Sequence, residues 1–451
     1  MSTRPNGPFG NRSSTQEFLL NKAETGTAEH LFGDIPSSVL EQLSAVFKEL
    51  AWATDFLNDA LEKLKETASF GVLAIRADGL PDSEEDGTDA PVEAFPWLDI
   101  LRQVDATSQE RNGIWGLISV DQYGLYLPHM DETASVEIGR SLQSAIRGQT
   151  ALTATIGIAA YPTLDYPKQQ ILHNAIKAVD HAAFFGPDSL AAFDSVSLNI
   201  SGDKRYQADD VDGAIAEYLK ALELDPSNVN VHNSLGVCYG ILGSHDKALT
   251  SFETAARIDP DEVMAVYNAG LVHILKEQPD KALGYLQKAK RISPDVYEVA
   301  FQIGKCHLDR AHYHRAIPHL EEAARLKPEA GAPWRYLGEC YAAIGRADPA
   351  IQAYETAIKR SPNDAAALSA LGHIYDQQNR NTEIATLFCQ QSVDLSPGNG
   401  VYYYRLGRLL QKQNRMEEAM TALRSATENG CDATAEIEEI KDRLKDTATD
   451  G

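Results

Sequence analysis

Residues 306–319 concentrate side chains that could bind a metal. The stretch holds Cys306 and four histidines, and thiolate and imidazole are ligands that zinc prefers. A metal site needs these side chains to converge on one point. In the register of the repeat described below, Cys306 and His307 face the interior of a helix, whereas His312 and His314 flank a turn. The spacing therefore favours separate packing positions, and we expect no metal site.

The cysteines give no sign of a disulfide framework. Their number is odd, they contain no C-x-x-C pair, and they lie far apart at Cys238, Cys306, Cys340, Cys389 and Cys431. This pattern predicts small buried residues in a reducing compartment.

The elements that position these residues repeat along the second half of the chain. Glycines from Gly202 to Gly372 and alanines from Ala214 to Ala350 recur every 34 residues. Prolines keep the same step at Pro226, Pro260, Pro294, Pro328 and Pro362. A period of this length indicates pairs of antiparallel helices, with small residues where the helices cross and proline at the end.

The pattern resembles the tetratricopeptide repeat, which implies an all-α superhelix that binds peptides or partner proteins. Seven units fill residues 196–433, starting near 195, 229, 263, 297, 331, 365 and 400. One extra residue falls in the turn near 379–382. Residues 434–451 are expected to form a capping helix and tail.

Two rows of residues are candidates for the partner-binding groove that this family forms with the first helix of each unit. Aromatic, Arg and Asn side chains would suit an extended peptide with a few apolar anchors. Alternatively, several members only pack against neighbouring helices. The first row is Asn233, Tyr267, Phe301, Arg335, Ser369 and Tyr404, and the second is Val237, Leu271, Lys305, Glu339, His373 and Arg408.

Residues 70–195 read as an α/β segment. Apolar runs predict strands at 70–77, 114–120, 123–128 and 152–160, with helices at 95–111, 133–147 and 168–185. This order suggests an antiparallel sheet covered by helices on one face. Residues 82–93 are acidic and are expected to form a solvated loop.

The segment resembles the GGDEF domain of diguanylate cyclases, which join two GTP molecules into cyclic di-GMP. The stretches T-I-G-I-A-A-Y-P at 155–162 and V-D-H-A-A-F at 179–184 match the family's strand and helix motifs. The resemblance implies a nucleotidyl-cyclase-like, ferredoxin-like fold. The family's central motif falls on Ser119, Val120, Asp121, Gln122 and Tyr123.

The departures from that family predict a domain without cyclase activity. Ser119 and Val120 replace the glycines that let the family's backbone approach nucleotide phosphates. Gln122 replaces one metal-binding carboxylate, and Arg76 stands where another is expected. Phosphoryl transfer between polyanions depends on metal to neutralise developing charge. Asp121 remains, although a lone Asp in a hairpin is commonly a turn former. We expect a catalytically inactive domain kept for docking, with Arg76 as a phosphate-binding alternative.

Apolar residues between 39 and 64 step by three and four, which predicts one amphipathic helix within 35–69. It could pack on its own domain or form a homodimer. Residues 1–34 are polar and expected to be disordered.

The whole chain of 451 residues carries a formal charge of −24, which argues against nucleic acid as a partner. It contains no apolar run long enough to span a membrane. We therefore expect a multidomain cytoplasmic adaptor without a cofactor. The competing hypothesis is a receptor for GTP or cyclic di-GMP.

Overall fold

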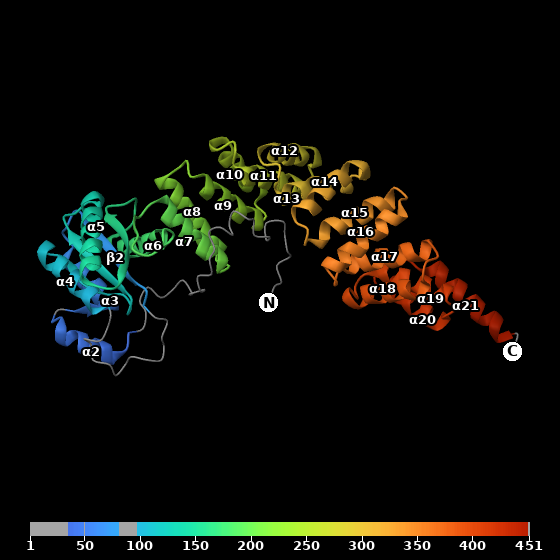
Figure 1. Ribbon diagram of the computed structural model, residues 1–451, viewed down its shortest axis with the longest axis horizontal. Helices are drawn as coiled ribbons and strands as arrows, with labels where there is room; N and C mark the ends of the chain where they lie inside the picture. The colour runs from blue at the N-terminus through green and yellow to red at the C-terminus, as the bar shows by residue number, and fades with distance from the viewer. Residues whose placement is uncertain (1–34, 49, 81–96, 450–451) are drawn as a thin grey trace. The chain divides into compact units, whose positions relative to one another are not determined.

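The computed structural model describes residues 35–48, 50–80 and 97–449 (Figure 1). The disordered segment expected at 1–34 and the acidic loop expected at 82–93 lie outside these residues. The chain forms two compact units, Met1–Ala265 and Val266–Gly451. Within the described part, no helix is both long and apolar enough to cross a membrane.

The described residues of the N-terminal part form six helical segments and a mixed sheet. Its strands and helices correspond in type and order to those predicted for residues 70–185, with two short strands added at the sheet edges. The elements are α2 (Ser37–Val46), β1 (Ala51–Trp52), α3 (Ala53–Lys63), β2 (Phe70–Asp78), α4 (Leu98–Arg111), β3 (Ile114–Leu117), β4 (Gln122–Pro128), α5 (Glu132–Gln149), β5 (Thr153–Tyr161), the 3₁₀ turn η2 (Lys168–Gln170), α6 (Ile171–Ala183) and β6 (Leu190–Ala192).

Among the described residues, the strands form one sheet in the order β1-β3-β4-β2-β5-β6. The four inner strands pair antiparallel, whereas the edge strands β1 and β6 pair parallel to β3 and β5. The sheet is therefore mixed, not purely antiparallel. Strands β1 and β6 have two and three residues, too few to show the alternation that identifies a strand in sequence.

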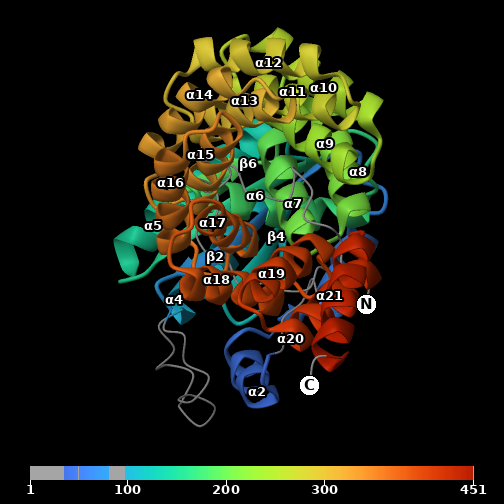
Figure 2. The same ribbon diagram turned by 90° about the vertical axis from the view of Figure 1, so that its right-hand side faces the viewer.

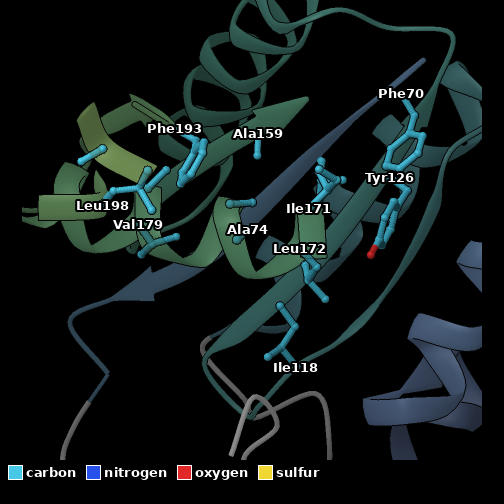
Figure 3. Close-up of a cluster of buried hydrophobic side chains, with 14 of the residues drawn as sticks. Phe70, Ala74, Ile118, Tyr126, Ala159, Ile171, Leu172, Val179, Phe193 and Leu198 are labelled. Carbon is cyan, nitrogen blue, oxygen red and sulfur yellow. The ribbon is translucent and has the colours of Figure 1, made fainter. Parts of the chain in front are cut away.

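Helices cover both faces of the sheet, so the expectation of one covered face was wrong. Phe70, Val72 and Ala74 of β2 pack in a core with α3 and α6 (Figure 3). Leu73 and Ile75 point to the opposite face and pack with α4 and α5. Successive side chains of a strand alternate between faces, so a nearly continuous apolar run such as β2 requires a cover on each side.

The segment 35–69 is not the single amphipathic helix that the sequence predicted. Helix α2 ends at Val46, and α3 begins only after the strand β1. Leu43, Ala60 and Leu64 are at most 1% exposed and belong to the cores of their own domain. The apolar spacing thus reflects two helices that pack on the sheet. The described residues of 35–69 thus do not form one continuous apolar stripe, and the homodimer stays a prediction.

The α/β part continues into the first helix pairs without a linker. Val179 of α6, Phe193 and Leu198 share one buried cluster that extends to Tyr218 in the first pair (Figure 3). Lys177 of α6 donates from Nζ to both carboxylate oxygens of Glu217 at 2.7 Å, and both side chains are at most 15% exposed. This shared core explains why the first compact unit reaches beyond the expected boundary at 195/196.

Residues 195–428, all of which the structure describes, form seven antiparallel helix pairs. Helix α21 (Thr434–Thr449) follows them. Within Val266–Gly451 the pairs follow one another in chain order (Figures 1 and 2). The pairs are α7/α8 (Ser195–Gln207, Val211–Leu224), α9/α10 (Val229–Ile241, His245–Ile258), α11/α12 (Val263–Leu275, Pro279–Ile292), α13/α14 (Tyr297–Asp309, Tyr313–Leu326), α15/α16 (Gly331–Ala343, Ala347–Arg360), α17/α18 (Ala365–Gln377, Thr382–Leu395) and α19/α20 (Gly400–Lys412, Met416–Glu428).

Small residues set the distance between the helices of a pair, as the sequence predicted. A Cβ atom on Gly236 of α9 would lie 2.6 Å from the ring of Phe252 in α10, so only glycine fits there. Ala248 is fully buried at the same contact. The extra residue of the sixth pair lies in its inter-helix turn, 378–381, where α13/α14 has only 310–312.

Candidate functional site

The expected cyclase-like motif forms the hairpin between β3 and β4. The Ser119 hydroxyl donates to the Asp121 carboxylate at 2.5 Å, and the backbone N–H groups of Ile118 and Ser119 donate to the Gln122 carbonyl. Tyr123 is fully buried, and its hydroxyl donates to the Val120 carbonyl at 3.2 Å. Burial, followed by the Asp121 charge, raises the pKa of Tyr123. The loop is thus closed by its own hydrogen bonds.

Arg76 lies beside this hairpin, opposite Gln122 on β4 and Thr155 on β5. Among the described residues, no carboxylate forms an ion pair with it. The neighbouring Asp78 accepts from the hydroxyls of Thr153 and Thr155 at 2.9 and 2.7 Å, and from the Asp188 N–H at 2.8 Å. Asp78 therefore ties β2 to β5 and to the loop before β6.

The two predicted groove rows lie on the first helices of the pairs. Within Val266–Gly451 these helices contact one another in succession, α13 with α15, α15 with α17 and α17 with α19. We call the side of this layer that bears the two rows the first-helix face. Phe301, Lys305 and His373 are half-buried there, and Glu339 is exposed.

Three of the predicted residues are not accessible to a partner. Tyr267 and Leu271 are only 7% and 2% exposed, and Ser369 is fully buried. Burial, together with the Glu298 charge, raises the pKa of Tyr267, while a hydrogen bond with Gln302 opposes this effect. At these three positions the side chains pack between helices. Asn233 and Val237, in the first compact unit, are half-buried.

An aromatic cluster occupies the middle of the first-helix face. Phe301 stacks on Tyr297 with ring centroids 5.7 Å apart and lies 5.6 Å from Tyr336 of α15. The Arg335 guanidinium covers Tyr336 at 4.0 Å from the ring centroid, and its Nε lies 3.1 Å from an Asp364 carboxylate oxygen. Aromatic side chains and arginine are the types enriched at protein interfaces.

A pocket of about 220 Å³ lies at the C-terminal end of the array, and we call it the C-terminal pocket. It brings together three predicted residues, His373 of α17 with Tyr404 and Arg408 of α19. Burial, followed by the Arg405 charge, lowers the pKa of His373, and the Asp376 charge opposes this shift. The lining residues are His373, Asp376, Tyr404, Arg405, Arg408, Leu409 and Lys412.

The sequence analysis missed Asp376, Arg405 and Lys412. Lys412 lies four residues after Arg408, so extending the helical spacing by one turn would have found it. Arg405 lies one residue after Tyr404 of the first row and three residues before Arg408 of the second, and it belongs to neither row. Arg405 lines the same pocket only because α19 packs against α17.

The cysteines and histidines do not form a metal site in the described part of the chain. No group of three or more His, Cys, Asp or Glu side chains there is arranged to hold a metal ion. The rings of His307 and His319 stack with centroids 5.8 Å apart, and those of His307 and His312 lie 6.1 Å apart. The five cysteines are free thiols, and burial raises the pKa of Cys340 to about 12.

Comparison with known families assigns the repeats. Models described as TPR repeat and tetratricopeptide repeat match residues 202–243, 242–296, 301–365, 343–400 and 401–429. These helix pairs are therefore tetratricopeptide repeats, which supports a protein-interaction scaffold. A comparison with curated proteins finds no match.

Solved structures similar to this chain include several repeat proteins. YrrB, described as a TPR protein with an unusual peptide-binding site, is 26% identical over 39% of this chain and 91% of its own, with a TM-score of 0.35. A MamA protein is 24% identical over 38% of this chain and 93% of its own, with a TM-score of 0.34. PilF of Pseudomonas aeruginosa is 20% identical over 46% of this chain and 94% of its own, with a TM-score of 0.43.

Proposed function

We propose that this protein is a non-catalytic adaptor whose first-helix face binds an extended peptide segment of a partner protein. The observation that carries this proposal is the aromatic cluster around Phe301 and its charged neighbours. Phe301, Lys305 and Glu339 lie on consecutive first helices, and each keeps part of its side chain exposed. Such a row offers an apolar anchor between charged side chains, which suits a peptide in extended conformation.

We further propose that the α/β part is a GGDEF-like domain that serves as a docking or regulatory module. The element order β2-α4-β3-β4-α5-β5 and the inner strand order β3-β4-β2-β5 support a ferredoxin-like arrangement. The position of the hairpin 118–122 beside the end of β2 supports the alignment of the cyclase motif.

The residues of this hairpin do not fit the magnesium that a cyclase would need. The Asp78 carboxylate already accepts hydrogen bonds from three protein donors, and the Asp121 carboxylate accepts one from the Ser119 hydroxyl. The other two candidate positions are the neutral Gln122 and the cationic Arg76, and magnesium prefers carboxylate oxygens. We therefore derive no phosphoryl transfer step for this site.

A peptide selection tests the adaptor proposal. The full chain would be panned against a random peptide library displayed on phage, and the selected peptides would be measured by fluorescence polarisation. Lys305→Glu should weaken binding about tenfold, because Lys305 lies on the first-helix face and has no ion-pair partner among the described residues. Lys359→Glu makes the same charge change at an exposed position of the second helix α16 and should leave binding unchanged. Equal effects of the two variants would contradict the proposal.

The nucleotide receptor remains the second candidate because of one observation: the Arg76 guanidinium beside the hairpin has no carboxylate partner among the described residues. A guanidinium can bind phosphate oxygens without a metal. Calorimetric titration of the full chain with cyclic di-GMP, and with GTP and magnesium, decides between the nucleotide receptor and an adaptor that binds no nucleotide. Saturable binding that Arg76→Ala removes would favour the receptor. Absence of heat at high micromolar ligand would eliminate it.

A further inference from the structure

The C-terminal pocket concentrates cations in a strongly acidic chain. Arg405, Arg408 and Lys412 line it in a protein whose formal charge is −24. The surrounding field of such a protein repels anions. A cluster of cations therefore marks a place where this protein could still attract an acidic ligand.

The protein itself neutralises only part of this charge. Lys412 Nζ donates to both carboxylate oxygens of Asp376 at 2.7 and 2.8 Å. Arg405, in contrast, donates from Nη1 to the neutral hydroxyl of Ser369 at 2.9 Å and meets no carboxylate among the described residues. A guanidinium carries five N–H donors, so most of those on Arg405 remain available. It is also half-buried, which makes an anionic counter-charge more favourable than it would be in bulk water.

Glu436 shows that Tyr404 and Arg408, two of the lining residues, can bind a carboxylate. From α21 it takes a hydrogen bond from the Tyr404 hydroxyl at 2.7 Å and one from Arg408 Nη1 at 3.3 Å. Arg405 follows Tyr404 in the chain and has no carboxylate partner in the part of the chain that the structure describes. A second carboxylate could bind there through a guanidinium, as Glu436 does through Arg408.

We infer that the C-terminal pocket binds a carboxylate side chain of an acidic peptide from a partner protein, with Arg405 as its main contact. The inference rests on the proposed function and names the chemistry of the partner. The volume of about 220 Å³ is below the range of roughly 300–1,000 Å³ common for small-molecule sites, so it suits one side chain better than a nucleotide.

The test compares two labelled peptides on the full chain. The first alternates glutamate with serine, and the second replaces every glutamate by glutamine. Both are amidated at the C-terminus, so that only side chains carry carboxylates. Fluorescence polarisation should show saturable binding of the glutamate peptide, about tenfold or more tighter than that of the glutamine peptide. Equal binding of both peptides, or none of the glutamate peptide, overturns the inference.

Two arginine variants locate the site. Arg405→Gln should weaken binding of the glutamate peptide about tenfold or more, because the substitution removes a charge-assisted hydrogen bond. Arg424→Gln makes the same charge change at an exposed position of α20 outside the pocket and should have no effect. An unchanged affinity of Arg405→Gln overturns the inference. Thermal unfolding of each variant separates lost binding from lost structure, and the comparison of peptides on the unmodified chain does not depend on either variant.

This experiment can fail independently of the adaptor proposal. Suppose that the random library yields peptides whose binding depends on Lys305, but the glutamate peptide does not bind. This result would refute only the inference about the C-terminal pocket. No selected peptide and no glutamate binding would refute both.

Discussion

Replacement of Asp203 by asparagine should stabilise the first compact unit at neutral pH. Asp203 lies on α7, where it accepts a hydrogen bond from the Tyr218 hydroxyl at 2.6 Å. Burial raises the pKa of the Asp203 carboxyl from 3.8 to about 6, although hydrogen bonds from Tyr218 and Ser234 lower it. The folded protein therefore holds this proton more tightly than the unfolded chain does.

The sign and size of the effect follow from this difference. Between pH 3.8 and about 6 the native state binds more protons at Asp203 than the unfolded state, so its contribution to stability falls as pH rises. A shift of about two units corresponds to about 3 kcal/mol at 1.36 kcal/mol per unit. Asparagine keeps an acceptor for the Tyr218 hydroxyl but adds an N–H₂ group that needs a partner. We therefore expect a net gain of about 2 kcal/mol at pH 7.5 and none at pH 4.5.

Scanning calorimetry of the full chain at several pH values would measure this gain. The difference in Tm between Asp203→Asn and the unmodified protein cancels the titration of all other groups. It should grow by about 4–8 °C between pH 4.5 and 7.5. Asp261→Asn, at an exposed position in the same unit, should give no pH-dependent difference. A Tm difference for Asp203→Asn that is constant with pH, or that falls as pH rises, would refute the reasoning.

Three further perturbations have defined outcomes. Lys168→Met should lower the free energy of unfolding by about 2 kcal/mol, because Lys168 Nζ donates to three backbone carbonyls at the end of α3; an unchanged Tm would contradict this. Burial, followed by the Lys290 charge, lowers the pKa of His319, so stability is full above its ordinary value of 6.5 and is lost as pH falls below it. His319→Gln should reduce this acid sensitivity in thermal unfolding between pH 7 and 5, and an unaltered profile would count against it. Gln122→Glu should produce no cyclic di-GMP from GTP by chromatography, because Arg76 remains beside the hairpin, and any detectable product would overturn the assignment of a lost metal site.

The sequence predicted the repeats well because their signal is repeated seven times. Each glycine like Gly236 and each alanine like Ala248 lies at a close helix crossing, so the same steric requirement recurs every 34 residues. The inner strands of the sheet were also predictable, since β2 and β5 are long and nearly continuous in apolar residues. The pair of short edge strands was not, because two or three residues carry no period.

The sequence by itself determined the two-helix period, the inner strands and the rows that bear candidate binding residues. It could not decide which members of a row remain accessible. Tyr267 and Phe301 occupy the same position in successive repeats, yet Tyr267 is buried, while Phe301 is half-exposed in a ring cluster. Nor could it place Arg405 beside His373, because that proximity depends on how α19 packs against α17. A periodic pattern specifies the face on which a side chain lies, whereas its exposure and its partners depend on the neighbouring helices that only the tertiary structure brings together.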